Sequence, residues 1–404
     1  MKANIIYSDL NPCGGGERLT LVTMRAILEM GIDIDLTTLE KPNTTKLENA
    51  YGKSISSVIK NIKKVNILKL LEEQSISNAI GKEYDIIINT HGDIVPYYNK
   101  SLSKNNAITY CHFPSAKFFI QSEDKAYLEK HLKIGRASLK SVTAGTDQHN
   151  PQKNSIDFDK KRYLRWLKDA YENLMKNSTV LTNSEYSRRA ILKICGIDNA
   201  IVVSPPVDVD SFRNGALTSS SSCIEREDIV LVVCRIDPLK KVENAIKLAK
   251  LLKENNIGTG MKIVGSLDVY YFDYYYYLKK MIEDFNLVDY VTFEIDVSFD
   301  KLLSFMRKSK IYFHPRSQEH FGISIVEAMS AGLIPIVPST GGQTEFVPSK
   351  YHFHTLEQAA QIASSGFNIP DSERILMSNS VKRFSTRNYI RGFQQVVNRL
   401  LVNT

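Results

Sequence analysis

The feature that most restricts the fold of this chain is a repeated order of segments: a short apolar run, a glycine or polar loop, and then a helix. The first example is residues 3–7, which lead through the glycines of NPCGGG into a helix expected over residues 17–30. Continuous apolar runs rich in β-branched residues indicate buried strands of a parallel sheet. Further runs lie at residues 34–39, 85–89, 107–111, 180–182, 200–203, 228–234, 261–264, 290–295, 310–314 and 334–337. The order predicts an α/β fold in which parallel strands alternate with helices.

A stiff segment divides the chain near its middle. Pro205 and Pro206 follow the strand expected at residues 200–203, and proline restricts its own backbone and that of the residue before it. A chain of 404 residues also exceeds the size of one comfortable core. We therefore expect two domains, the first covering residues 1–206.

Two glutamates in the second half of the chain, Glu319 and Glu327, lie in the stretch HPRSQEHFGISIVEAMSAGLIPIVPSTGG. We predict a loop over residues 317–320, a helix over residues 322–331 and a buried strand over residues 334–337. Glu327 is then about one and a half turns into the helix and can face the same side as Glu319. Both could be ordinary surface acids, but their flanks are apolar and rich in glycine, where an unpaired carboxylate is costly.

The start of that helix is a candidate binding site. The free backbone N–H groups of Phe321, Gly322 and Ile323 suit an anionic phosphate or the oxygens of a sugar, and Gly322 allows close approach. A carboxylate accepts hydrogen bonds through two oxygens, which matches a vicinal diol. One acid for a hexose and one for a ribose is a coherent interpretation of Glu319 and Glu327.

Basic residues follow the strand expected at residues 228–234. Arg235 and Lys240 lie five residues apart where this strand leads into a helix. A guanidinium group binds two oxygens at once and an ammonium group neutralises charge, so the pair suits a leaving diphosphate. Lys241 is the alternative to Lys240, since the register could differ by one residue.

The spacing of Glu319 and Glu327, EHFGISIVE, followed by EAMSAGLIPIV and a Gly-Gly turn, resembles the signature of glycosyltransferase family 4. These are retaining enzymes of the GT-B fold, which has two Rossmann-like domains with parallel sheets facing across a cleft. The resemblance implies a nucleotide-sugar-binding domain over residues 207–380 and a C-terminal helix, within residues 381–404, that crosses back to the first domain. GGGER, CHFP and QEHFG are most similar to the dolichyl-pyrophosphate-glycan mannosyltransferases of this family, although Gln318 stands where that group has Asn.

The resemblance assigns a role to each candidate site residue. Glu319 contacts the donor hexose and Glu327 the donor ribose, while Arg235 and Lys240 stabilise the leaving diphosphate. His112, in CHFP, lies beside the transferred sugar, and the loop at Gly15 and Gly16 approaches the diphosphate. Val297 lies against the nucleobase. The implied reaction moves a hexose, with mannose from GDP-mannose favoured, to a glycan or lipid-linked glycan without a metal or other cofactor.

Composition limits the partners. Residues 1–207 hold 29 of the 52 Lys and Arg but only 22 of the 44 Asp and Glu, which fits a first half that meets an anionic acceptor or membrane surface. The basic segment at residues 117–141 is a candidate for that contact.

No basic stripe interleaved with aromatics points to nucleic acid. Without a long apolar run, a cytoplasmic protein that is peripheral to a membrane is expected. The five scattered cysteines indicate neither a disulfide framework nor a zinc site.

Two other functions compete with sugar transfer. A nucleotide-sugar 2-epimerase shares the fold but would turn over the donor without an acceptor. A dinucleotide-dependent oxidoreductase would use the loop at residues 14–16, which lacks the spacing G-x-G-x-x-G, with Glu40 as the one candidate for the ribose acid.

Overall fold

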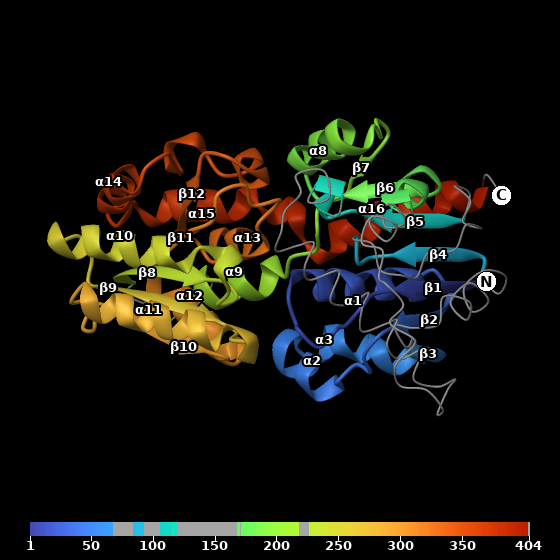
Figure 1. The fold of residues 1–404 in the computed structure, drawn as a ribbon, viewed down its shortest axis with the longest axis horizontal. Coiled ribbons are helices and arrows are strands. Elements are labelled where there is room, and N and C mark those ends of the chain that lie inside the picture. The colour runs from blue at the N-terminus through green and yellow to red at the C-terminus, as the bar shows by residue number, and fades with distance from the viewer. Residues whose placement is uncertain are drawn as a thin grey trace, which may run out of the picture. The chain divides into compact units, whose positions relative to one another are not determined.

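The computed structural model describes residues 1–67, 84–92, 106–115, 117–118, 168–169, 171–217 and 226–402. Within them the chain forms two compact units, which are Met1–Ser204 with Ile390–Thr404, and Pro205–Tyr389. Each unit is built on a wholly parallel sheet with helices around it (Figure 1). The predicted α/β class is therefore confirmed, and both sheets have the strand order of Rossmann-like domains. Most of the candidate membrane-contact segment at residues 117–141 lies outside the described residues.

The sheet of the first unit has the order β3-β2-β1-β4-β5-β6-β7. Its strands are β1 (Lys2–Ile6), β2 (Asp33–Thr38), β3 (Lys64–Ile67), β4 (Ile86–Asn89), β5 (Ala107–Tyr110), β6 (Thr179–Thr182) and β7 (Ile201–Val202). The described helices are α1 (Gly15–Leu28), α2 (Thr44–Tyr51), α3 (Lys53–Ser56) and α8 (Glu185–Cys195). The predicted order of apolar run, glycine loop and helix is thus realised in β1 and α1.

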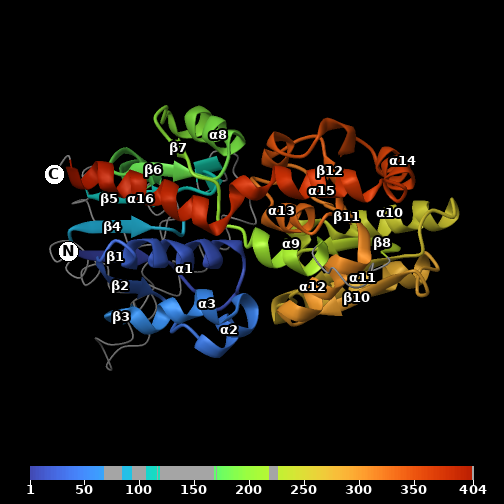
Figure 2. The ribbon, with the colours of Figure 1, turned by 180° about the vertical axis from the view of Figure 1, so that it is seen from behind.

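The C-terminal helix α16 (Thr386–Val402) packs with its later residues against the first unit. The side-chain amide of Gln394 donates to the carbonyl oxygen of Ala26 in α1 over 2.9 Å. The two helices lie side by side along the sheet (Figure 2). The end of the chain therefore contributes to the same core as its beginning.

The sheet of the second unit has the order β10-β9-β8-β11-β12-β13. Its strands are β8 (Glu227–Val233), β9 (Gly260–Gly265), β10 (Val291–Ile295), β11 (Ser309–Phe313), β12 (Ile334–Pro338) and β13 (His352–Phe353). Its helices are α9 (Val209–Leu217), α10 (Val242–Glu254), α11 (Phe272–Asp284), α12 (Phe299–Lys308), α13 (Ile323–Ser330), α14 (Leu356–Gly366) and α15 (Asp371–Ser380). From β8 the chain adds β9 and β10 on one side and then β11, β12 and β13 on the other side. The order of strand addition therefore changes direction between β8 and β11, which are hydrogen-bonded neighbours.

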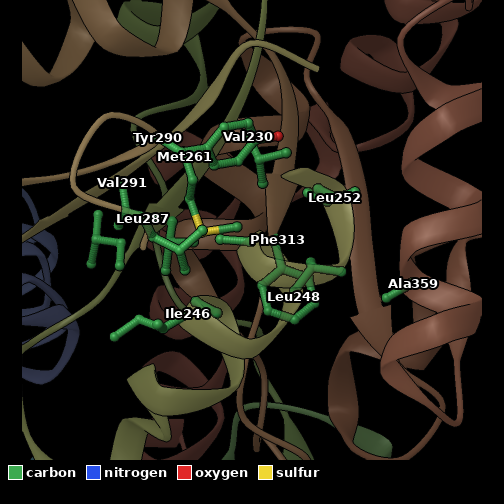
Figure 3. Close-up of a cluster of buried hydrophobic side chains, with 14 of the residues drawn as sticks. Val230, Ile246, Leu248, Leu252, Met261, Leu287, Tyr290, Val291, Phe313 and Ala359 are labelled. Carbon is green, nitrogen blue, oxygen red and sulfur yellow. The ribbon is translucent and has the colours of Figure 1, made fainter. Parts of the chain in front are cut away.

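Alternation along the strands divides the core of the second unit into two layers, because successive side chains of a strand point to opposite faces. Val230 and Phe313 face α10, α11 and α14, where they join the cluster drawn in Figure 3. Leu231 and Tyr312 face α9, α12 and α13. Both layers are closely filled, so the strands are fixed and their carboxyl ends present loops in defined positions.

Candidate active site

The candidate site of the second unit lies where its chain order reverses. The loop after β8 and the loop after β11 leave neighbouring parallel strands at the same edge of the sheet. In open α/β sheets this edge is the usual place for ligands. The first loop carries Arg235 and Lys240, and the second carries Glu319.

Asp237 shapes the loop after β8. Its side chain accepts hydrogen bonds from the backbone N–H groups of Leu239, at 2.9 Å, and Lys240, at 3.1 Å. Lys241 then adopts a left-handed backbone with φ 54° before α10 begins. The two lysines consequently diverge: Lys240 turns to Glu319, while Lys241 turns to Glu243, 3.8 Å from its Nζ. This geometry settles which of the two adjacent lysines reaches the acid.

The loop after β11 is tied to the loop after β12. The N–H of Gln318 donates to the carbonyl oxygen of Thr340 over 2.9 Å, and the N–H of Gly342 donates to that of Glu319 over 2.7 Å. Gly341, with φ 132°, lies so close that an added Cβ would stand 2.6 Å from the carbonyl oxygen of Glu319. Only glycine fits at that position, because the clash is with backbone. Glu319 is therefore held through its main chain.

The carboxylate of Glu319 has one crowded oxygen and one more open oxygen. Oε2 lies 3.1 Å from Lys240 Nζ, 3.4 Å from His314 Nε2 and 3.9 Å from Arg316 Nη1. Oε1 accepts a hydrogen bond from the N–H of His320 over 3.2 Å. Since a carboxylate oxygen accepts two hydrogen bonds, Oε1 retains capacity for a ligand hydroxyl.

Electrostatics keep Glu319 ionised. Burial by itself would raise the pKa of its carboxyl group, but Lys240, His314 and Arg316 outweigh that effect and hold the pKa well below its ordinary value. The Glu319 side chain is 12% exposed and that of Lys240 is 21% exposed. The pair is thus a partly buried ion pair within reach of solvent.

The start of α13 supplies backbone donors beside Glu319. Gly322 caps the helix with φ 95°, and the N–H groups of Phe321, Gly322 and Ile323 make no hydrogen bond within the described parts of the chain. The ring of Phe321 is buried against other aromatic rings, which fixes the backbone at this point. Glu327, further along α13, is 8% exposed. The predicted helix start is present, displaced by one residue.

Arg235 lies in the loop after β8, and Val297 lies in the loop after β10, at the same edge of the sheet. The Arg235 side chain is 56% exposed and its Nε lies 3.4 Å from Asp237 Oδ2. No ion pair or hydrogen bond joins it to Glu319 in the described structure. Val297 follows β10 and is partly buried against the core. Arg235 is therefore an exposed cation beside Asp237, whereas Val297 is held by packing.

Gly15, Gly16 and His112 belong to the first unit. Gly15 and Gly16 open α1, and an added Cβ at Gly16 would stand 2.5 Å from the hydroxyl of Tyr7. His112 follows β5, and its Nε2 lies 3.0 Å from the carbonyl oxygen of Thr90. That contact places the ring proton on Nε2 and leaves Nδ1 as an acceptor. Burial lowers the pKa of His112, and the bond to Thr90 offsets this only in part.

His314 was not singled out as a site residue by its sequence. It ends the apolar segment at residues 310–314 and is 2% exposed in the structure, directly beside Glu319. A histidine at the carboxyl end of a strand, five residues before a candidate acid, is the signal that could have identified it. Chance placement of histidine is common enough that the signal alone is weak.

The described residues contain no group of three or more His, Cys, Asp or Glu side chains arranged to hold a metal ion. Among the helices of the described ranges, none combines the length and the apolar character that a bilayer-spanning helix needs.

Comparison with known proteins links the second unit to sugar transfer. Residues 219–363 match the family "Glycosyl transferases group 1". The chain is 26% identical over 241 residues to the GDP-Man:Man(3)GlcNAc(2)-PP-Dol alpha-1,2-mannosyltransferase of Neurospora crassa, covering 52% of this chain and 43% of the relative. The enzymes of the same name from Homo sapiens and Caenorhabditis elegans are 28% and 25% identical, over 41% and 72% of this chain. These matches span 35% and 60% of those two relatives, so each of the three is covered over less than two thirds of its length.

Solved structures share the fold over the whole chain. A glycosyltransferase from Rickettsia africae has a TM-score of 0.67 at 14% identity, covering 100% of this chain and 99% of its own. Sucrose-phosphate synthase from Thermosynechococcus elongatus has a TM-score of 0.65 at 14% identity, covering 100% of both chains. The predicted GT-B fold is thereby confirmed.

Proposed function

Because residues 219–363 match the family of group 1 glycosyl transferases, we propose that this protein is a retaining hexosyltransferase that uses a nucleotide-sugar donor. Mannose from GDP-mannose is the favoured donor sugar and a lipid-linked glycan the favoured acceptor, since the similar mannosyltransferases carry both in their names. The observation that carries the proposal is the convergence of Lys240 and Glu319 from neighbouring strands at the carboxyl edge of one sheet.

The donor diphosphate is the anion that the loop after β8 would bind. Arg235 is exposed and can present two N–H groups to phosphate oxygens, and Lys240 adds a mobile positive charge. As the glycosidic bond to the diphosphate breaks, negative charge grows on the leaving oxygen, and fixed cations stabilise it most at that moment. The free N–H groups at the start of α13 can bind further oxygens of the donor.

Glu319 would orient the hexose through Oε1, the oxygen with open capacity. Glu327, further along α13, would accept the ribose hydroxyls. In the first unit, His112 would accept from a sugar hydroxyl through Nδ1, and the helix start at Gly15 and Gly16 would approach the diphosphate. The acceptor hydroxyl then attacks on the face that the diphosphate leaves, and a phosphate oxygen takes its proton. None of these steps requires a metal.

A location follows from the proposed acceptor. We propose that the protein works in the cytoplasm, at the surface of an anionic membrane that holds the lipid-linked glycan. The surplus of basic residues in the first 207 positions supports this, because basic surfaces are attracted to anionic lipids.

A donor screen tests the function. GDP-mannose, UDP-glucose and dTDP-sugars are each added to the purified protein and the thermal midpoint is measured, with NAD as a matched nucleotide control. A donor at a hundred times its Kd should stabilise the folded state by about 2.7 kcal/mol. We expect stabilisation by GDP-mannose and transfer of mannose when a lipid-linked acceptor is added.

Two outcomes of this screen would contradict the transferase function, and a third would reject only its favoured donor. Stabilisation by NAD together with indifference to nucleotide-sugars would favour the oxidoreductase. Turnover of the donor to an isomer without acceptor would favour the 2-epimerase. Stabilisation by UDP-sugars alone would keep the transferase and reject mannose from GDP-mannose.

A further inference from the structure

A buried nitrogen lies beside Glu319 without a partner. His314 is 2% exposed, and its Nε2 makes no hydrogen bond to any residue that the structure describes. Glu319 Oε2 is 3.4 Å away, but the direction does not suit a hydrogen bond. An unsatisfied buried polar group is destabilising, so a native protein rarely keeps one without a reason.

The other side of the imidazole ring is fixed. Nδ1 lies 3.5 Å from the hydroxyl of Tyr312, and that hydroxyl is 2.7 Å from Ser324 Oγ in the first turn of α13. The two rings are stacked, with 20° between their planes. Burial raises the pKa of Tyr312 well above its ordinary value, so the hydroxyl stays protonated; it donates to the carbonyl oxygen of Val233 over 3.4 Å. Because Oε2 of Glu319 can only accept a hydrogen bond, the tautomer of neutral His314 that suits this neighbour carries its ring proton on Nε2.

The ion pair with Lys240 fixes the position of Oε2. Lys240 Nζ is the cation nearest to Oε2 and donates to it over 3.1 Å, so the carboxylate is held where the N–H of His314 does not point at it. Our proposed function requires Lys240 to stabilise the donor diphosphate. When Lys240 turns toward that stronger anion, the 12% exposed carboxylate of Glu319 loses its main partner. A carboxylate left in this state is costly unless another donor replaces the lysine.

We propose that His314 is a positioning residue that takes over Oε2 of Glu319 when Lys240 moves to the donor diphosphate. Once Lys240 has left, a small rotation of the Glu319 carboxylate, with a shift of about 0.5 Å, would bring Oε2 into line with the N–H of His314 at ordinary hydrogen-bond distance. Glu319 then keeps its orientation toward the hexose while the diphosphate gains a cation. This inference rests on the proposed function, and it adds an exchange of partners that occurs on donor binding.

A neutral imidazole suits this exchange. Burial lowers the pKa of His314, and Glu319 counteracts that effect only in part because Lys240 and Arg316 lower it further. The ring therefore donates a hydrogen bond without adding a third full positive charge beside Oε2.

The test compares His314→Leu, which removes the N–H, with His314→Gln, which retains one on a side chain of similar reach. The exposed His354 supplies the control variant His354→Leu in the same unit. For each protein we would measure kcat and KM with GDP-mannose, donor Kd by calorimetry, and thermal midpoint. We expect His314→Leu to lose about 10-fold to 100-fold in kcat with donor Kd within about threefold, since positioning contributes in the transition state.

Stability separates positioning from a structural role. Removing an unsatisfied nitrogen should leave the thermal midpoint of His314→Leu unchanged or higher, while its turnover falls. His314→Gln should recover most of the turnover. A normal rate in His314→Leu, or equal loss in His314→Gln, would overturn the inference and leave the transferase function intact. Absence of transfer by the unaltered protein from every nucleotide-sugar would reject the proposed function, and the inference with it.

Discussion

Lys240 Nζ lies 3.1 Å from Glu319 Oε2, although 78 residues separate the two in the chain and they arise from loops after different strands. In the proposed reaction these groups act on the two sides of the bond that breaks, one on the diphosphate and one on the hexose. Without a donor they neutralise each other. The ion pair is therefore a direct contact between the proposed diphosphate-binding cation and the proposed hexose-binding acid.

This contact should be visible as an energetic coupling. Lys240→Met leaves the partly buried carboxylate of Glu319 without its nearest cation and should lower the free energy of unfolding by about 2 kcal/mol, between the values of exposed and buried pairs. Adding Glu319→Gln should restore part of that loss. Urea unfolding of both single variants and the double variant measures the coupling, which should be about 1–2 kcal/mol. Strictly additive effects would show that the pair contributes nothing.

The two glutamates should differ in kinetics. Glu319→Gln should lower kcat about 100-fold or more, since it removes an interaction that orients the reacting sugar. Glu327→Gln should raise the donor Kd about 10-fold and leave kcat within a few-fold, as expected for a group that binds the ribose. Steady-state kinetics with GDP-mannose and calorimetry separate the two effects. Glu357→Gln, on the exposed side of α14, is the control. Identical effects of the first two variants would reject their separate roles.

Arg235 offers a comparison with a neighbouring cation. Arg235→Ala should lower kcat about 100-fold because a cation that stabilises the leaving diphosphate is lost, and stability should change little because the side chain is 56% exposed. Lys241 has the same exposure but turns to Glu243, so Lys241→Ala should retain turnover. Rates and unfolding curves for both variants test this. A larger loss of rate in Lys241→Ala would return the catalytic role to that lysine.

The buried His314 should make stability depend on pH. In the unfolded chain its pKa is about 6.5, and in the folded chain it is lower. Between these two values the unfolded chain binds a proton that the folded chain does not, so the free energy of unfolding falls as the pH falls below about 6.5. Glu319, Lys240, Arg316 and Tyr312 are the charged and titratable groups that face the ring.

The measurement is urea unfolding of the unaltered protein and of His314→Gln at pH 7.5, 6.5, 5.5 and 5.0. The difference between the two proteins should move in favour of the variant as the pH falls, by at most about 1.4 kcal/mol for each pH unit. A difference that stays constant over this range would mean that the folded pKa is not lowered.

The sequence predicts the fold well because parallel strands leave a strong periodic signal. The strand expected at residues 310–314 and the helix expected at residues 322–331 appear as β11, Ser309–Phe313, and α13, Ile323–Ser330. Strand ends then place Arg235, Lys240 and Glu319 at one edge by topology alone. Which of Lys240 and Lys241 reaches Glu319 was beyond the sequence, because it depends on the left-handed turn at Lys241.

Side-chain partners outside the periodic pattern could not be predicted. Arg374 lies in a polar stretch typical of a surface helix, yet it is 1% exposed and donates to the carbonyl oxygens of Lys310, at 2.7 Å, and Gly332, at 3.1 Å. His314 likewise depends on a stacked tyrosine two residues earlier and an acid five residues later. Such contacts are set by the tertiary structure rather than by local residue order.

Gly341 has a consequence for any attempt to transplant this site. The backbone of Glu319 rests against a glycine from the loop after the next strand, where no other residue fits. Grafting residues 314–330 onto another scaffold would therefore transfer the acid but not the loop after β12, which fixes the position of its backbone. The smallest portable unit is the pair of adjoining loops together, including a residue that offers no side chain to the chemistry at all.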